Sequence, residues 1–114
     1  MYNRDENRDR KYAHFVEKIL NRSSDEFPYW EEAAEWTIEQ AVRRGEYETA
    51  VKLELACGRT SIASLKAQEF EKCLGAEAKA RIVLAIYKIG ETDLARRFQH
   101  RWMITRLLPP EFRP

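Results

Sequence analysis

The fold is decided in residues 75–90, which read GAEAKARIVLAIYKIG. Two glycines enclose a stretch of good helix formers without proline, and its centre, residues 82–87, is apolar on nearly every side. Glycine is the preferred residue just beyond a helix C-terminus, because it adopts positive φ at no steric cost. The pattern predicts a helix over residues 76–89 that lies at the centre of the core.

The same punctuation continues outward from this stretch. The four glycines of the chain follow one another at intervals of 13, 17 and 15 residues, close to the length of a helix with its turn. No proline interrupts the sequence between Pro28 and Pro109. These signals predict six helices, over residues 4–21, 29–44, 46–57, 60–74, 76–89 and 91–108.

Short connections indicate how these helices are arranged. Links of one to three residues between the later helices make consecutive helices fold back as antiparallel neighbours. The expected fold is an all-α, six-helix antiparallel helical-hairpin bundle that forms one domain over residues 1–108. The prolines at 109–110 predict an extended tail over residues 109–114, either frayed or laid across a neighbouring subunit with Phe112 as its anchor.

Residues 47–57 carry a second pattern. Val51, Leu53 and Leu55 alternate with polar neighbours, as they would in a strand. A lone strand would have no partner in this chain, so the helix is the preferred interpretation.

Composition places the chain among soluble globular proteins. Of its 114 residues, 44% are hydrophobic, and 20 basic residues against 19 acidic ones leave a net charge of +1. That balance excludes the broad positive field with which strongly basic proteins coat nucleic acid. No apolar run approaches the roughly 20 residues that cross a bilayer, and the first residues, MYNRDE, contain no apolar stretch for a signal peptide. We therefore expect a cytoplasmic protein without a membrane partner.

The two cysteines, Cys57 and Cys73, each end an apolar stretch close to a glycine. Cytosolic thiols stay reduced, and no nearby histidine completes a zinc site. We expect two structural thiols packed as small hydrophobic side chains, with a disulfide between neighbouring helix ends as the alternative.

A six-residue motif occurs twice. Residues 45–50 read GEYETA and residues 90–95 read GETDLA, so both copies share Gly-Glu-x-acidic-x-Ala, 45 residues apart. The glycine makes a turn, the acids lie at the N-terminus of the next helix, and the alanine lets that helix pack closely on the preceding one.

This motif resembles the turn and second-helix start of tetratricopeptide-type hairpins, where a glycine and a small alanine stand five positions apart. Tyr47 matches the aromatic residue often found two places after that glycine. The spacing of 45 is longer than the family's repeat of about 34 residues, and the family's large first-helix residues are not in register before Gly45. The resemblance implies a scaffold that presents surfaces to partners.

The inventory of reactive residues does not favour catalysis. His14 and His100 stand in no metal-ligand spacing with carboxylates of the Glu-x-x-His kind, and the sequence contains no phosphate loop, nucleophile elbow or His-Glu-x-x-His motif. We expect no enzyme activity, no cofactor and no bound metal.

Charge is distributed unevenly along the chain. Residues 25–54 hold nine acids against three bases, a net charge of −6. Residues 79–114 hold eight bases against three acids, a net charge of +5. The nearly neutral total therefore conceals a strongly dipolar sequence.

The acidic end includes an aromatic edge, which we call the acidic face. Tyr29 and Trp36 are seven residues apart and so lie on one edge of the predicted helix over 29–44. Exposed Tyr and Trp next to carboxylates suit an arginine-bearing partner, whereas the simpler alternative is that both rings widen the core. The acidic face comprises Tyr29, Glu32, Glu35, Trp36 and Glu39.

The basic end is the last predicted helix, where Arg96, Arg97, His100 and Arg101 share one arc that we call the basic face. Three interpretations stay open for it. The arginines suit phosphates of a nucleic acid, ion pairs with the acidic helix of the same or a second chain, or a charged protein interface.

The sequence thus predicts a non-enzymatic interaction protein, either an adaptor, a complex subunit or a protein inhibitor, that binds a partner protein through its charged and aromatic helix faces. The alternative is a nucleic-acid-contacting small subunit of a ribonucleoprotein or DNA-associated complex that uses the basic C-terminal helix. Separated charge of this kind also favours a homodimer, head-to-tail or two-fold.

Overall fold

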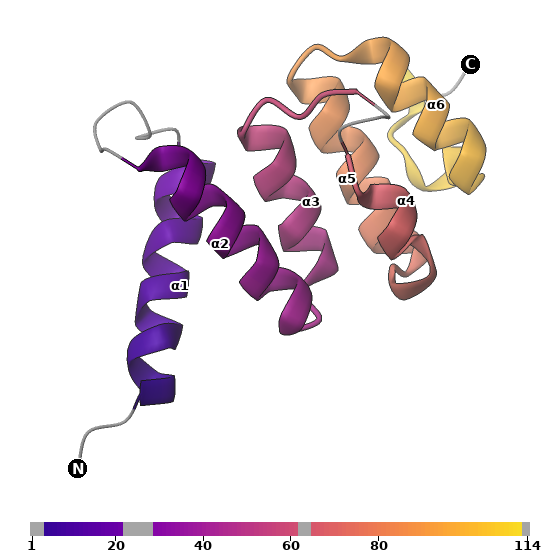
Figure 1. Ribbon diagram of the computed structural model, residues 1–114. Helices are drawn as coiled ribbons and strands as arrows, with labels where there is room; N and C mark the ends of the chain where they lie inside the picture. Colours follow the sequence, from indigo (N-terminus) through magenta and orange to yellow (C-terminus); the bar gives the residue numbers. More distant parts are fainter. Residues whose placement is uncertain (1–3, 22–28, 62–64, 113–114) are drawn as a thin grey trace. The chain divides into compact units, whose positions relative to one another are not determined.

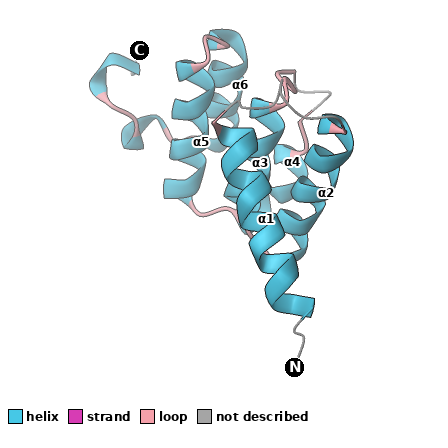
Figure 2. Cartoon of the chain, turned by 90° about the vertical axis from the view of Figure 1, so that its left-hand side faces the viewer, coloured by secondary structure: helices cyan, strands magenta, loops and turns pink. Residues whose placement is uncertain are grey.

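The chain is predominantly helical in the part that the structure describes. The computed structural model describes residues 4–21, 29–61 and 65–112 (Figure 1), and these residues include no strand (Figure 2). Their helices are α1 (Arg4–Leu20), α2 (Trp30–Arg43), α3 (Tyr47–Ala56), α4 (Ala67–Phe70), α5 (Ala76–Lys88) and α6 (Thr92–Trp102). Three short 3-10 turns complete the list: η2 (Glu71–Cys73), η3 (Thr105–Leu107) and η4 (Pro110–Phe112). The all-α prediction is confirmed, including the helix at 47–57, while the antiparallel arrangement stays a prediction.

The chain divides into two compact units, Met1–Gly58 and Arg59–Pro114. This division does not test whether residues 1–108 form the single domain that we expected, so the single domain stays a prediction. No helix among the described residues combines the length and apolar character that a membrane span requires.

In the first unit, α1, α2 and α3 pack on one another. α3 contributes the most deeply buried side chains, because Ala50, Val51 and Leu53 are all fully inaccessible to solvent. α2 adds Ala34, Ile38 and Ala41 to this core. On α1, Tyr12 and Ile19 are buried, whereas Leu20 is exposed at the end of the helix.

Tyr12 ties α1 to the end of α2. The Arg44 guanidinium lies 4.4 Å from the centre of the Tyr12 ring and reaches Asp9 of α1 at 2.7 Å. Burial raises the pKa of the Tyr12 hydroxyl to about 12, and the Glu46 carboxylate adds to this effect. The phenol is therefore neutral and serves as a packed ring of the core.

In the second unit, α5 and α6 pack together and η3 contacts α5. The expectation that residues 82–87 are central holds for Ile82, Val83 and Ile86, which are fully inaccessible to solvent. α6 contributes the rings of Phe98 and Trp102, whose centres lie 4.7 Å apart. These aromatic and aliphatic side chains form the core beneath the basic face.

The repeated motif makes the same turn in both units. Gly45 and Gly90 have φ values of 73° and 88°, and their N–H groups donate to carbonyls three residues earlier, at 3.0 Å in each copy. The alanine five positions later, Ala50 or Ala95, is fully buried in each copy. Positive φ explains the glycine, and close helix packing explains the alanine.

The helix predicted over 60–74 is wrong. Among its described residues, only Ala67–Phe70 is α-helical; the 3-10 turn η2 follows, and Leu74 is extended. Leu65 and Ala67 are both buried although they are only two positions apart, which one face of an α-helix does not allow. The predicted helix also includes residues 62–64, which lie outside the described residues.

The last helix is shorter than predicted, because α6 ends at Trp102 rather than at 108. Met103 adopts a left-handed conformation with φ 54°, and the chain then turns to bury Ile104 and Leu108. In a continuous helix Ile104 would lie about 200° around the axis from Trp102 and so point away from the core. The reversal at Met103 therefore brings both apolar side chains inside.

The C-terminal segment is not extended as predicted. Pro110–Phe112 forms the 3-10 turn η4, in which proline occupies the first position, where its missing N–H costs nothing. Phe112 stacks on Tyr87 of its own chain, with ring centres 4.5 Å apart. This intramolecular contact replaces the expected anchor on a neighbouring subunit; residues 113–114 lie outside the described residues.

Both cysteines are free thiols. Cys57 is half-buried, and this burial raises the pKa of its thiol. Cys73 is exposed at the end of η2, so the expectation of a packed thiol is wrong there.

Candidate partner-binding faces

The acidic face lies on α2, in the first unit. Glu32, Glu35 and Glu39 are all exposed, and Glu39 accepts a hydrogen bond from Arg43 one turn later. Their alignment follows from the helical spacing of the three glutamates. The carboxylates on this face are therefore available to solvent, with the charge of Glu39 offset by a surface ion pair.

Trp36 is a packed member of this face rather than a protruding one. Its ring is half-buried and meets Phe15 of α1 edge-on, with ring centres 6.2 Å apart. The Lys11 ammonium lies 4.7 Å from the centre of the same ring. Trp36 thus joins α1 to α2, in line with the alternative that this ring widens the core.

Tyr29 behaves in the opposite way. It precedes α2 in a left-handed conformation with φ 66°, and 72% of its surface is exposed. Glu31 and Glu32, in the first turn of α2, are exposed beside it. The start of α2 therefore presents one exposed tyrosine ring, followed within three residues by two exposed carboxylates.

The basic face lies on α6, in the second unit, and Arg96, Arg97, His100 and Arg101 are all exposed there. Arg101 is already occupied within its own unit. Its Nε and Nη2 donate to the two carboxylate oxygens of Glu71, each at 2.8 Å. Arg101 thus has a structural role although it is exposed, and Arg96, Arg97 and His100 complete the exposed arc.

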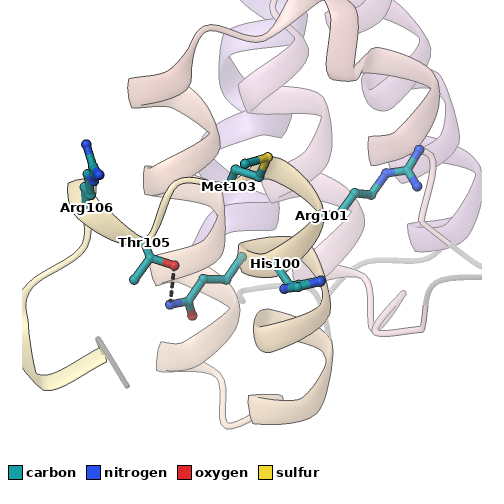
Figure 3. A pocket seen from close by; sticks show the side chains of 6 residues that line it. His100, Arg101, Met103, Thr105 and Arg106 are labelled. Atoms are coloured by element: carbon teal, nitrogen blue, oxygen red, sulfur yellow. Dashed lines mark hydrogen bonds between the residues drawn. The ribbon is translucent and has the colours of Figure 1, made fainter.

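Beyond the basic face, the turn after α6 forms an open hollow of about 760 Å³ that we call the C-terminal hollow (Figure 3). Figure 3 shows His100 and Arg101 on the end of the helix, Met103 at the turn, and Thr105 and Arg106 on η3. Met103 has 88% of its surface exposed. The lining residues are Gln99, His100, Arg101, Met103, Thr105 and Arg106.

A buried amide organises the floor of this hollow. Gln99 has only 6% of its surface exposed. It accepts a hydrogen bond from the Tyr87 hydroxyl and donates to Thr105 Oγ1 at 3.2 Å and to the Phe112 carbonyl at 3.0 Å. Gln99 thereby holds α5, η3 and the C-terminal turn in one arrangement, which fixes its own position and that of Thr105 in the lining of the hollow.

Tyr29 of the acidic face and Met103, at the turn after the basic face, share a feature that the sequence predicted only in part. Tyr29 and Met103 are the only described residues other than glycine with positive φ. They are also the two most exposed of the large hydrophobic side chains described. Tyr29 was predicted as a site residue and Met103 was not. The break in the apolar spacing between Trp102 and Ile104 was the signal that could have indicated a turn at Met103.

The unit boundary also separates the charge. The first unit has thirteen acidic and nine basic residues, a net charge of −4, and the second has eleven basic and six acidic residues, a net charge of +5. Among the described residues, no cluster of His, Cys, Asp or Glu has the arrangement of a metal site. The chemistry that these faces offer is ion pairing, hydrogen bonding and apolar contact.

Comparisons with protein-family models, with curated proteins and with solved structures found no match to this chain. The residues themselves therefore carry any inference about function.

Proposed function

We propose that this chain is a non-enzymatic interaction protein, acting as an adaptor, complex subunit or inhibitor, that binds a partner protein through its acidic and basic faces. The observation that carries this proposal is the exposure of Tyr29 and Met103 on left-handed backbone, one next to each face. An L-residue in this conformation costs about 1–2 kcal/mol. Glycine would make either turn without that cost, so the two side chains are better explained by a role outside the fold.

Both side chains suit a protein interface. Tyrosine combines a large contact area with few rotatable bonds, and methionine adapts its flexible thioether to irregular apolar surfaces. Leu107, half exposed on η3, adds further apolar surface near Met103 in the sequence. Charged residues around an apolar anchor provide the rim that steers the partner and selects it.

A protein partner is favoured over nucleic acid at the basic face for two reasons. Arg101 is held by Glu71, which reduces the charge available to phosphates. The N-terminal turn of α6 also exposes the acidic residue Asp93, which repels a phosphate backbone. Nucleic-acid binding through Arg96, Arg97 and His100 is the alternative outcome of the test below.

The test is capture of the partner from an extract of the native host, with and without nuclease treatment, with the tagged chain as bait. We expect one or more proteins, identified by mass spectrometry, to be retained by the wild type and lost from Tyr29→Gly or Met103→Gly. Leu20→Ser is the matched control, because it removes an exposed apolar side chain outside both faces. Equal retention by all four baits would contradict the proposal, and loss of every partner upon nuclease treatment would support the nucleic-acid alternative instead.

A further inference from the structure

The C-terminal hollow combines basic and apolar side chains, which suit an acidic segment that carries an aromatic ring. Its lining combines the cationic side chain of Arg106 with the imidazole of His100, the apolar chain of Met103 and the Arg101 guanidinium, whose charge Glu71 partly offsets. Its volume of about 760 Å³ falls within the range of protein pockets that hold compact ligands, so it has room for an aromatic ring. The Gln99 amide donates to Thr105 and to the Phe112 carbonyl, which holds η3 in place. The hollow therefore needs little rearrangement to bind a ligand.

The chain itself carries a segment of the matching kind. Tyr29 stands at the start of α2 with 72% of its surface exposed, and the exposed glutamates Glu31 and Glu32 follow two and three positions later. The Tyr29 ring complements the apolar thioether of Met103, and the nearby carboxylates complement the positive charge of Arg106. The opposite net charges of the two units, −4 and +5, favour the same pairing over a longer range.

We propose that the C-terminal hollow binds Tyr29, together with Glu31 and Glu32, from a second copy of this chain. This inference rests on the proposed function, because it names a partner for the same two faces. The contact joins two different surfaces and is therefore heterologous. Each added copy brings a free tyrosine segment or a free hollow, so association continues beyond a dimer unless the copies close into a ring.

Mixing two complementary variants tests this contact. Tyr29→Gly removes the ring and keeps the hollow, whereas Met103→Gly changes the hollow and keeps the ring. Sedimentation equilibrium of the purified wild type, from micromolar to millimolar concentrations, should show a mass that rises with concentration. We expect each variant alone to associate at least roughly tenfold more weakly, because a central apolar anchor is lost. An equimolar mixture should recover one wild-type contact and stop at a pair of one copy of each variant.

Leu20→Ser is again the control and should associate as the wild type does. Added salt should weaken association, because the rim of the contact is ionic. The proposal is overturned by a wild type that stays monomeric, by variants that associate as strongly as the wild type, or by a mixture that recovers nothing. A monomeric wild type that still captures a host protein through Tyr29 and Met103 would overturn self-association alone, whereas loss of that capture would overturn the proposed function.

Discussion

Arg101 holds Glu71 through two parallel hydrogen bonds, each 2.8 Å long, across thirty positions of the sequence. The indole N–H of the neighbouring Trp102 donates to the same carboxylate at 3.0 Å. Glu71 begins the 3-10 turn η2, and its two donors lie in the last turn of α6. The carboxylate therefore attaches the short α4–η2 segment to the end of the longer helix.

This attachment predicts a stability that depends on pH. The hydrogen bonds from Arg101 and then from Trp102 lower the pKa of Glu71 from 4.5 to about 2. Because the folded-state pKa lies below the unfolded one, the contribution is complete above about pH 4.5 and is lost as the pH falls towards 2. As the pH is lowered between these values, the midpoint temperature of thermal unfolding should fall more steeply for the wild type than for Glu71→Gln. Glu69→Gln, at an exposed carboxylate of α4, should leave the wild-type slope unchanged, and equal slopes for all three chains would contradict the prediction.

Gln99 predicts how the C-terminal turn is held. Gln99→Leu keeps a side chain of comparable size but removes the bonds to Tyr87, Thr105 and Phe112. Leaving these polar groups without their partner should cost about 1–3 kcal/mol in the free energy of unfolding, measured with denaturant. Gln40→Leu, at a half-buried glutamine of α2, serves as the control; similar losses in both variants would show that the network has no special role.

Local signals predicted the helices well where spacing and glycine agreed. Gly45 and Gly90 marked two helix ends because positive φ is a property of the residue itself, and both adopt it. The helix expected over 60–74 failed because the burial of both Leu65 and Ala67 is decided by tertiary packing, which overrides local propensity.

The site residues were predictable to a smaller extent. Helical spacing aligned Arg96, Arg97, His100 and Arg101, but it held no information that Glu71 would pair with Arg101. The C-terminal hollow could not be predicted from the sequence either. Gln99, which lines it, is held by Tyr87, 12 positions earlier, and by Phe112, 13 positions later. Such contacts depend on how the turns fold back, which no periodicity encodes.

Replacing a turn glycine by alanine should lower the free energy of unfolding through backbone strain and not through a steric clash. A methyl group added at Gly90 meets no atom within 4 Å, so Gly90→Ala should cost only the strain of its φ of 88°. We expect a loss of about 1 kcal/mol in the free energy of unfolding, and the same for Gly45→Ala. Gly75 is equally open but has φ −72°, so Gly75→Ala should stay within about 0.5 kcal/mol of the wild type. Equal losses at Gly75 and Gly90 would refute the assignment to backbone strain.

Met103 predicts a gain in stability together with a loss of binding. Its side chain is 88% exposed, so removing it sacrifices little packing, while glycine relieves the strain of φ 54°. Met103→Gly should therefore raise the free energy of unfolding by about 0.5–1 kcal/mol. Met103→Ala is the matched control: it removes the same side chain but keeps the strained backbone, so it should give no gain. Both variants should lose the partner. If Met103→Gly instead lowers stability, the methionine contributes to the fold, and its exposure no longer points to an interface.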